Sequence, residues 1–181
     1  MPAASLQGNG SPMDITETSK HLESITVCTG VAVHSIAFSY VDYAGEKHST
    51  GRWGWGGSGG QPETIHLAKS EVVTELSGTI GKVDDRTVIT SIKFVTNLKK
   101  TYGPWGAYGD DRDTQFIVPM QPGSGIVGFF GHAGDYLDAI GIYARAIPTT
   151  TTTPVMGRSL DRGFMVLISF DFLRLLQLVA S

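Results

Sequence analysis

Residues 134–138 combine a glycine, two carboxylates and a tyrosine in one short loop, which reads Gly-Asp-Tyr-Leu-Asp. A loop that starts at Gly134 can fold back tightly. The backbone N–H groups of Asp135 and Tyr136 can then point inward beside the carboxylate of Asp138. This arrangement suits a sugar, because one carboxylate accepts from adjacent hydroxyls while amides donate back and the tyrosine covers the ring. Hydrogen bonds to charged groups contribute about 1.5–3 kcal/mol each, a large share of the roughly 4 kcal/mol of a millimolar site.

The same residues allow two other interpretations. Asp138 can cap the turn by hydrogen bonding to the backbone, with no ligand involved. Asp135 and Asp138 can also be taken as a glycosidase pair, which requires carboxylates about 5–9.5 Å apart on opposite sides of the scissile bond. Two side chains three residues apart on one tight loop are poorly placed for that. The spacing favours binding over hydrolysis and leaves the capping interpretation open.

Three similar units place this loop in a repeated architecture. Each unit has an alternating apolar strand, a glycine, a variable loop, and a Ser-Ile or Ala-Ile anchor that starts a second alternating strand. The units lie at residues 25–40, 73–94 and 126–143, about 50 residues apart. Period-2 alternation on both sides of a loop predicts antiparallel hairpins. Because propellers need four or more blades, three units predict a closed all-β prism whose sheets share one core.

Only the third unit carries an acid at the position before its anchor. Alignment on the anchors superposes His34, Thr90 and Asp138, and the first two are not carboxylates.

The composition excludes several functional classes. The chain has 181 residues, 41% hydrophobic and 17% charged, with a net charge of −3, which predicts one ordinary folded domain. No basic cluster larger than Lys99-Lys100 is present, so nucleic acid is not an expected partner. The five histidines show no metal-ligand spacing, and no cofactor is expected.

Compartment is predicted from the single cysteine and the first ten residues. Cys28 lies in an apolar run and is expected to be a small buried residue. Residues 1–10 lack the basic and apolar regions of a secretory signal. Both features favour a reducing compartment, the cytosol first and the nucleus second.

Several further residues are interpreted from their immediate sequence context. Trp53 and Trp55 either form an exposed aromatic platform for a glycan or pack over a sheet edge. Asp84-Asp85 and Asp110-Asp111 are expected in solvated turns. Residues 148–181 form a Thr/Pro linker and an apolar tail of unknown structure. A short helix that docks on a partner, a membrane-surface segment and a sequence from an alternative reading of the gene remain open for this tail. The tail is too short and too interrupted by charge to span a bilayer comfortably, so membrane insertion is not expected.

Three motifs resemble the jacalin-related lectin family, over roughly residues 6–147. They are GFFGHAGDYLDAIGIY at 128–143, TNLKKTYGPWG at 96–106, and GNGSPMDI at 8–15 followed by LESI at 22–25. The resemblance implies a β-prism of three four-stranded Greek-key sheets with pseudo-threefold symmetry, with a lectin domain at residues 1–147.

The resemblance also implies a set of sugar-binding residues. Gly10 would contribute backbone, Gly134 would start the loop, Asp135 and Tyr136 would donate backbone N–H groups, and Asp138 would provide its carboxylate. Tyr102 matches an aromatic that packs near the sugar in some members.

Two departures from the family pattern affect the first strand and the number of sites. Residues 4–7 replace the usual Gly-x-Trp-Gly-Gly run, which is expected to loosen the first strand. His34 stands where a second site would carry its acid, so the resemblance implies one site per chain. Galactose-binding members have a free amine, produced by proteolysis, at the position of Gly10. Since this chain runs unbroken through Gly10, the resemblance favours mannose or glucose.

Two non-enzymatic functions follow. The first is a mannose- or glucose-binding lectin that gains strength as a homo-oligomer. The alternative is a protein-interaction module of the same fold without sugar binding. Many plant members of the family act in stress or defence, so the resemblance extends that expectation to this chain.

Overall fold

The computed structural model describes residues 10–55, 60–107, 111–147 and 164–168. Gly8, Asn9, Asp110 and the threonine run at 149–153 lie outside these residues. Within the described part every regular element is a strand, and no helix there is long and apolar enough to cross a membrane. The prediction of an all-β fold is confirmed.

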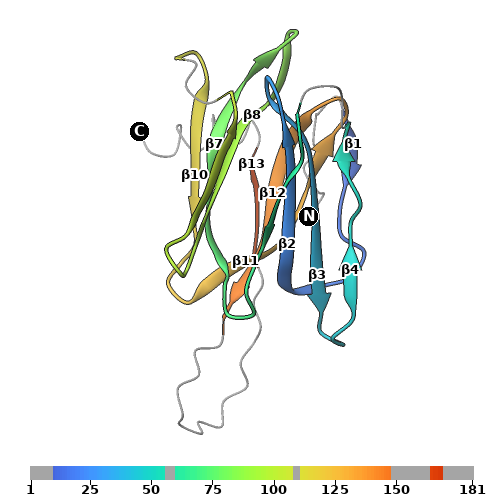
Figure 1. The fold of residues 1–181 in the computed structure, drawn as a ribbon, viewed down its shortest axis with the longest axis vertical. Helices are drawn as coiled ribbons and strands as arrows, with labels where there is room; N and C mark the ends of the chain where they lie inside the picture. Colours follow the sequence, from blue (N-terminus) through green and yellow to red (C-terminus); the bar gives the residue numbers. More distant parts are fainter. Residues whose placement is uncertain (1–9, 56–59, 108–110, 148–163, 169–181) are drawn as a thin grey trace, which may run out of the picture.

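The strands follow the three units in order (Figure 1). Long hairpins dominate the fold and short strands flank them. The strands are β1 (Ser11–Met13), β2 (Ser19–Thr29), β3 (Val33–Asp42), β4 (Lys47–Ser49), β5 (Trp53–Gly54), β6 (Glu63–His66), β7 (Val73–Val83), β8 (Arg86–Thr96), β9 (Thr101–Gly106), β10 (Thr114–Pro119), β11 (Ser124–Ala133), β12 (Leu137–Ala146) and β13 (Phe164–Ile168).

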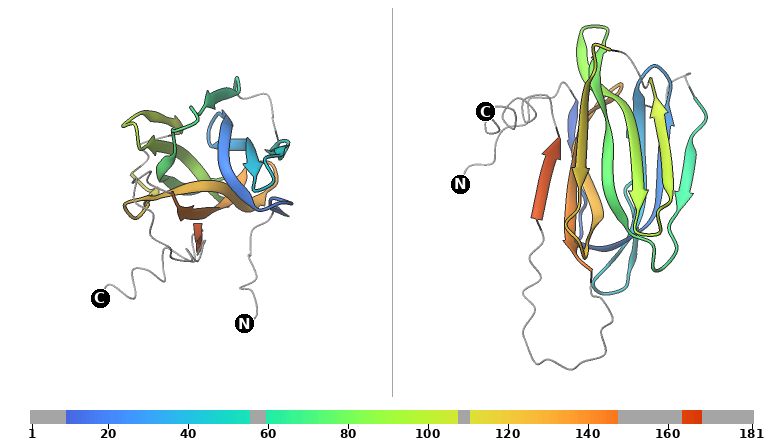
Figure 2. Two further views of the ribbon diagram at one scale, coloured as in Figure 1. Left: turned by 90° about the horizontal axis from the view of Figure 1, so that it is seen from below. Right: turned by 90° about the vertical axis from the view of Figure 1, so that its left-hand side faces the viewer.

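Hydrogen bonding groups the described strands into two sheets, where three were expected. One sheet has eight strands and contains the β7–β8 and β11–β12 hairpins, and the other has five and contains β2–β3. The two hairpins of the larger sheet are joined by the single register pair Ile126↔Val73. This one pair joins two hairpins into a single sheet, so the described strands form two sheets instead of three. In space the three hairpins still lie on three sides of the molecule (Figure 2).

The core lies between the three hairpins and takes equivalent residues from each. The anchor isoleucines Ile36, Ile92 and Ile140 are 0%, 0% and 1% exposed. The Phe129 ring on β11 lies 5.1 Å from Phe38 on β3 and 5.9 Å from Phe94 on β8, measured between centroids. Side chains of one face of each strand therefore pack into one shared interior, as the alternation predicted.

Strand β13 comes from the segment whose structure the sequence left open. It pairs with β12 in antiparallel fashion, from Ile140↔Ile168 to Ala144↔Phe164, and forms the outer edge of the larger sheet (Figure 2). These five residues are extended, so the docking-helix interpretation does not hold for them.

Candidate functional site

The three long hairpins turn at the same end of the molecule, and a glycine on or beside the strand that flanks each hairpin approaches the aligned position there. A Cβ on Gly54 or Gly106 would overlap the carbonyl oxygen of His34 or Thr90, respectively. Both glycines have φ +101, a conformation that favours glycine. In the third unit the close glycine is Gly10. A glycine thus approaches each aligned position, at the carbonyl oxygen of His34 and Thr90 but at the side chain of Asp138, and only this third position holds a carboxylate.

Gly10 lies directly against Asp138 although 128 positions separate them in the numbering. A Cβ on Gly10 would overlap Oδ2 of Asp138 and the carbonyl group of Ala133. Its own carbonyl oxygen lies 3.1 Å from Nδ1 of His132. The next residues form β1, which pairs with the end of β11 through Ser11↔Ala133. This pairing brings the first described residues of the chain to the β11–β12 loop.

Asp138 is the second residue of β12, and its carboxylate is partly buried. Oδ2 is inaccessible to solvent and has no hydrogen-bond partner of normal geometry among the described residues. Burial raises the pKa of Asp138, while nearby Arg86, His132 and the Gly10 N–H act in the opposite direction. A buried acceptor without a donor is unfavourable. A ligand hydroxyl can reach only the part of Asp138 that remains open to solvent, since this residue is half-buried as a whole.

The loop before β12 exposes its backbone beside this carboxylate. Gly134 and Asp135 are exposed and Tyr136 is half-buried. The Gly134 N–H donates to the Tyr136 carbonyl oxygen at 2.9 Å, which closes the loop on itself. The Tyr136 ring meets the edge of the His34 ring, with centroids 5.2 Å apart and planes at 72°. The structure thus brings Gly10, Gly134, Asp135, Tyr136 and Asp138 together.

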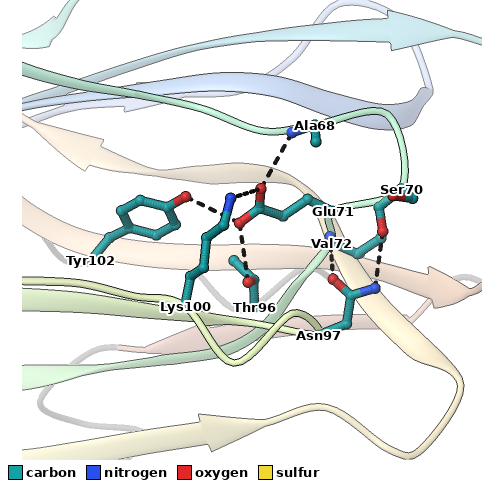
Figure 3. A network of polar contacts seen from close by, with 8 residues as sticks. All are labelled: Ala68, Ser70, Glu71, Val72, Thr96, Asn97, Lys100 and Tyr102. Atoms are coloured by element: carbon teal, nitrogen blue, oxygen red, sulfur yellow. Dashed lines mark hydrogen bonds and ion pairs between the residues drawn. The ribbon is translucent and has the colours of Figure 1, made fainter.

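Tyr102 is not part of this cluster. It lies opposite Phe94 on β8. Phe94 is eight residues from Arg86 along that strand, or about 26 Å at the rise of an extended strand. Its hydroxyl donates to Glu71 at 3.0 Å (Figure 3). Tyr102 therefore has a structural role at the opposite end of the molecule.

Arg86 and His132 belong to the site but were not predicted. Arg86 begins β8 and pairs with Asp135, and His132 lies on β11 beside Gly10. One signal in the sequence could have pointed to Arg86: it comes directly after the hairpin turn of the second unit in the aligned repeats. Nothing in the sequence distinguished His132 from the other histidines.

The two tryptophans that were candidates for a glycan platform separate. Trp53 is 5% exposed and packs edge-on against Phe38, with centroids 5.0 Å apart. Trp55 is 64% exposed. Trp53 is therefore a packing residue, while Trp55 is exposed to solvent.

Gly10→Ala is expected to weaken sugar binding at least tenfold and to lower the melting temperature. The added methyl would overlap the Ala133 backbone, which cannot rotate away, and would push β1 off β11 or displace Asp138. Ser11→Ala changes the next, exposed residue of β1 and is the matched control. Calorimetric titration and thermal unfolding of both variants test this, and equal behaviour of the two would contradict the close contact.

The fold and this loop-end cluster define an all-β domain with a candidate polar binding site between two segments that are distant in the sequence. The chain belongs to the jacalin-like lectin domain family, which matches residues 4–143. Proteins of this family bind carbohydrate and are not enzymes, so the glycosidase interpretation is excluded.

Relatives and solved structures agree with this assignment. Horcolin from Hordeum vulgare is 42% identical over 137 residues, which cover 75% of this chain and 90% of that protein. A mannose/glucose-specific lectin from Parkia pendula is 37% identical over 144 residues, covering 75% of this chain and 30% of that protein. The structure is similar to that of AcmJRL, a mannose-binding jacalin-related lectin from Ananas comosus. That similarity has a TM-score of 0.68 at 33% identity and covers 78% of this chain and 93% of the other.

Proposed function

We propose that the chain binds mannose- or glucose-type glycans at one site per chain, formed by Gly10, the Gly134–Tyr136 loop and Asp138. The observation that carries the proposal is the half-buried carboxylate of Asp138, which lies against the Gly10 backbone beside the exposed residues Gly134 and Asp135. Two adjacent sugar hydroxyls would donate to this carboxylate. The N–H groups of Asp135 and Tyr136 would donate to sugar oxygens, and the Tyr136 ring would cover one face.

The preference for mannose or glucose has two supports. The Parkia pendula and Ananas comosus lectins carry mannose or mannose/glucose in their names. In addition, the sequence continues through Gly10, so the N–H of this residue belongs to a peptide bond and supplies no free amine for an axial hydroxyl.

The residues at the aligned positions support the proposal of one site per chain. His34 is 9% exposed and Thr90 is 3% exposed, and neither offers a carboxylate. Thr90 is further occupied by hydrogen bonds to Thr79 and Asp113.

Titration of the ¹⁵N-labelled chain with methyl α-mannoside tests the proposal. We expect saturable, millimolar shifts of the Gly10, Asp135 and Tyr136 amides and of no second cluster around Val31 or Ala107. Methyl α-galactoside is the control sugar and should shift these amides less. Absence of saturable shifts up to tens of millimolar mannoside, about the weak limit of such sites, would leave the protein-interaction module as the better account.

Further proposals concern the whole molecule. We propose a three-sided prism with pseudo-threefold symmetry, supported by the equivalent anchor isoleucines that the three hairpins contribute to the shared core. We also propose a homo-oligomer, because a single weak site gains useful strength only when several act together. The free, buried Cys28 supports a reducing compartment, the cytosol first and the nucleus second.

A further inference from the structure

The β7–β8 hairpin of the second unit brings a cation to the sugar site. Its turn consists of Asp84 and Asp85, with φ of +49° and +62°, values typical of the two-residue turns that match strand twist. Val83 and Arg86 close the hairpin as paired residues. The position of Arg86 is therefore determined by the sheet and the tight turn.

The Arg86 side chain contacts the binding loop of the third unit. Its Nη1 donates to Oδ2 of Asp135 at 2.5 Å. The guanidinium is also close enough to Asp138 to oppose the effect of burial on that carboxyl group. One arginine thus pairs with Asp135 and acts electrostatically on Asp138, and its pairing partner is 49 residues away in the chain.

The loop has few other restraints among the described residues. Gly134 and Asp135 are exposed, and one backbone hydrogen bond closes the loop. His34 of the first unit supports the far side through the Tyr136 ring. Arg86 supports the near side, where the Asp135 N–H must point toward the ligand.

We propose that Arg86 is a positioning residue for sugar binding: its ion pair with Asp135 holds the Gly134–Tyr136 loop in the conformation that presents its backbone N–H groups. The inference rests on the proposed sugar-binding function. It assigns the side chain of Asp135 a role separate from that of its backbone, namely to anchor the loop to the neighbouring unit.

The expected effect is moderate because the pair is open to water. The Arg86 and Asp135 side chains are 45% and 59% exposed, so solvent and salt screen their attraction. We expect Arg86→Ala to raise the dissociation constant of methyl α-mannoside roughly two- to fivefold, without abolishing binding. Asp135→Asn, which keeps the backbone N–H, should have a similar effect.

A double-mutant cycle at two salt concentrations tests the proposal. Dissociation constants of methyl α-mannoside are measured for the wild type, Arg86→Ala, Asp135→Asn, the double variant and Arg86→Lys, in about 50 mM and about 500 mM NaCl. The double variant should bind no more weakly than either single variant, and Arg86→Lys should recover part of the loss. High salt should reduce the differences. Lys82→Ala removes an exposed positive charge from the same hairpin and should bind like the wild type.

Two results would overturn the role of Arg86. One is additive effects of the two single substitutions, and the other is equal behaviour of Arg86→Ala and Lys82→Ala. A ligand-free measurement separates this proposal from the proposed function. The heteronuclear ¹⁵N relaxation of the Asp135 and Tyr136 amides should show a more mobile loop in Arg86→Ala than in Lys82→Ala. Failure of the wild type to bind mannoside contradicts the sugar site, while unchanged relaxation contradicts the positioning role.

Discussion

Replacing Asp138 by asparagine is expected to weaken methyl α-mannoside binding at least about 100-fold while the domain stays folded. Two hydroxyl donors to one carboxylate contribute about 1.5–3 kcal/mol each, and about 1.4 kcal/mol corresponds to a tenfold change in affinity. Burial raises the pKa of Asp138, so the folded chain holds this charge unfavourably at neutral pH. Its removal should therefore leave the melting temperature equal or slightly higher.

The same pKa direction predicts how binding depends on pH. A carboxyl group with a raised pKa takes up its proton at a higher pH than an ordinary aspartate, and the neutral group loses acceptor strength. Mannoside affinity should fall on acidification at a higher pH than an ordinary aspartate would give, and Asp84→Asn should show the same fall because it keeps Asp138.

The matched control for this variant is Asp84→Asn. Asp84 is exposed at the same end of the molecule, and its φ of +49° suits asparagine. Calorimetric titration with methyl α-mannoside and thermal unfolding of both variants test this prediction. Mannoside binding by Asp138→Asn within threefold of the control would mean that the carboxylate only caps its turn.

The hairpins and the site loop could be predicted because their signals are local. Alternation along each strand and the Ser-Ile or Ala-Ile anchors lie within one unit, and Ile36, Ile92 and Ile140 are buried accordingly. Cys28 is buried, and Asp84 and Asp85 are exposed turn residues; both predictions are confirmed. The meeting of Gly10 with Asp138 was predicted only by the family resemblance, since nothing local relates the two ends of the domain.

Features that depend on contacts between units could not be predicted. The single pair Ile126↔Val73 decides that two hairpins share one sheet, and no pattern in either strand marks it. Arg86 acquires its role from Asp135 in another unit. Tyr102 was associated with the sugar because of its motif. Its hydroxyl instead donates to the carboxylate of Glu71, which the sequence gives no reason to expect inside the protein.

That carboxylate, Glu71, is a buried charge at the end of the domain opposite the sugar site. It is 0% exposed and accepts from four donors (Figure 3). They are the Lys100 ammonium at 2.8 Å, the Tyr102 hydroxyl at 3.0 Å, the Thr96 hydroxyl at 3.1 Å and the Ala68 N–H at 3.4 Å. Burial raises the pKa of Glu71, but these donors together outweigh burial and hold it below the usual value.

Glu71→Gln is expected to destabilise the domain by about 2–3 kcal/mol and to lower its melting temperature by roughly 5–10 °C. The amide has the same shape, but its NH₂ group would face groups that themselves donate. The value lies below the 3–5 kcal/mol of a fully buried broken pair, because Lys100 is 50% exposed and water screens it. Loss of the bonds to Glu71 should also loosen the connection between residues 68–72 and the turn after β8.

The pH dependence of this difference provides an independent check. Because the folded pKa of Glu71 is lowered, its contribution to stability is present above the unfolded value of about 4.3 and is lost as pH falls through the folded value. The gap between wild type and Glu71→Gln should therefore be widest near neutral pH and shrink below about pH 4.

Glu75→Gln is the matched control for Glu71→Gln, since Glu75 is 29% exposed and lies 3.8 Å from Lys93. We expect it to change stability by less than about 1 kcal/mol. Chemical denaturation gives both values, and mannoside titration should show unaltered affinity in either variant because the site lies at the other end. A stability loss in Glu71→Gln no larger than in Glu75→Gln, or one that persists unchanged at low pH, would show that the Glu71 charge does not hold these segments together.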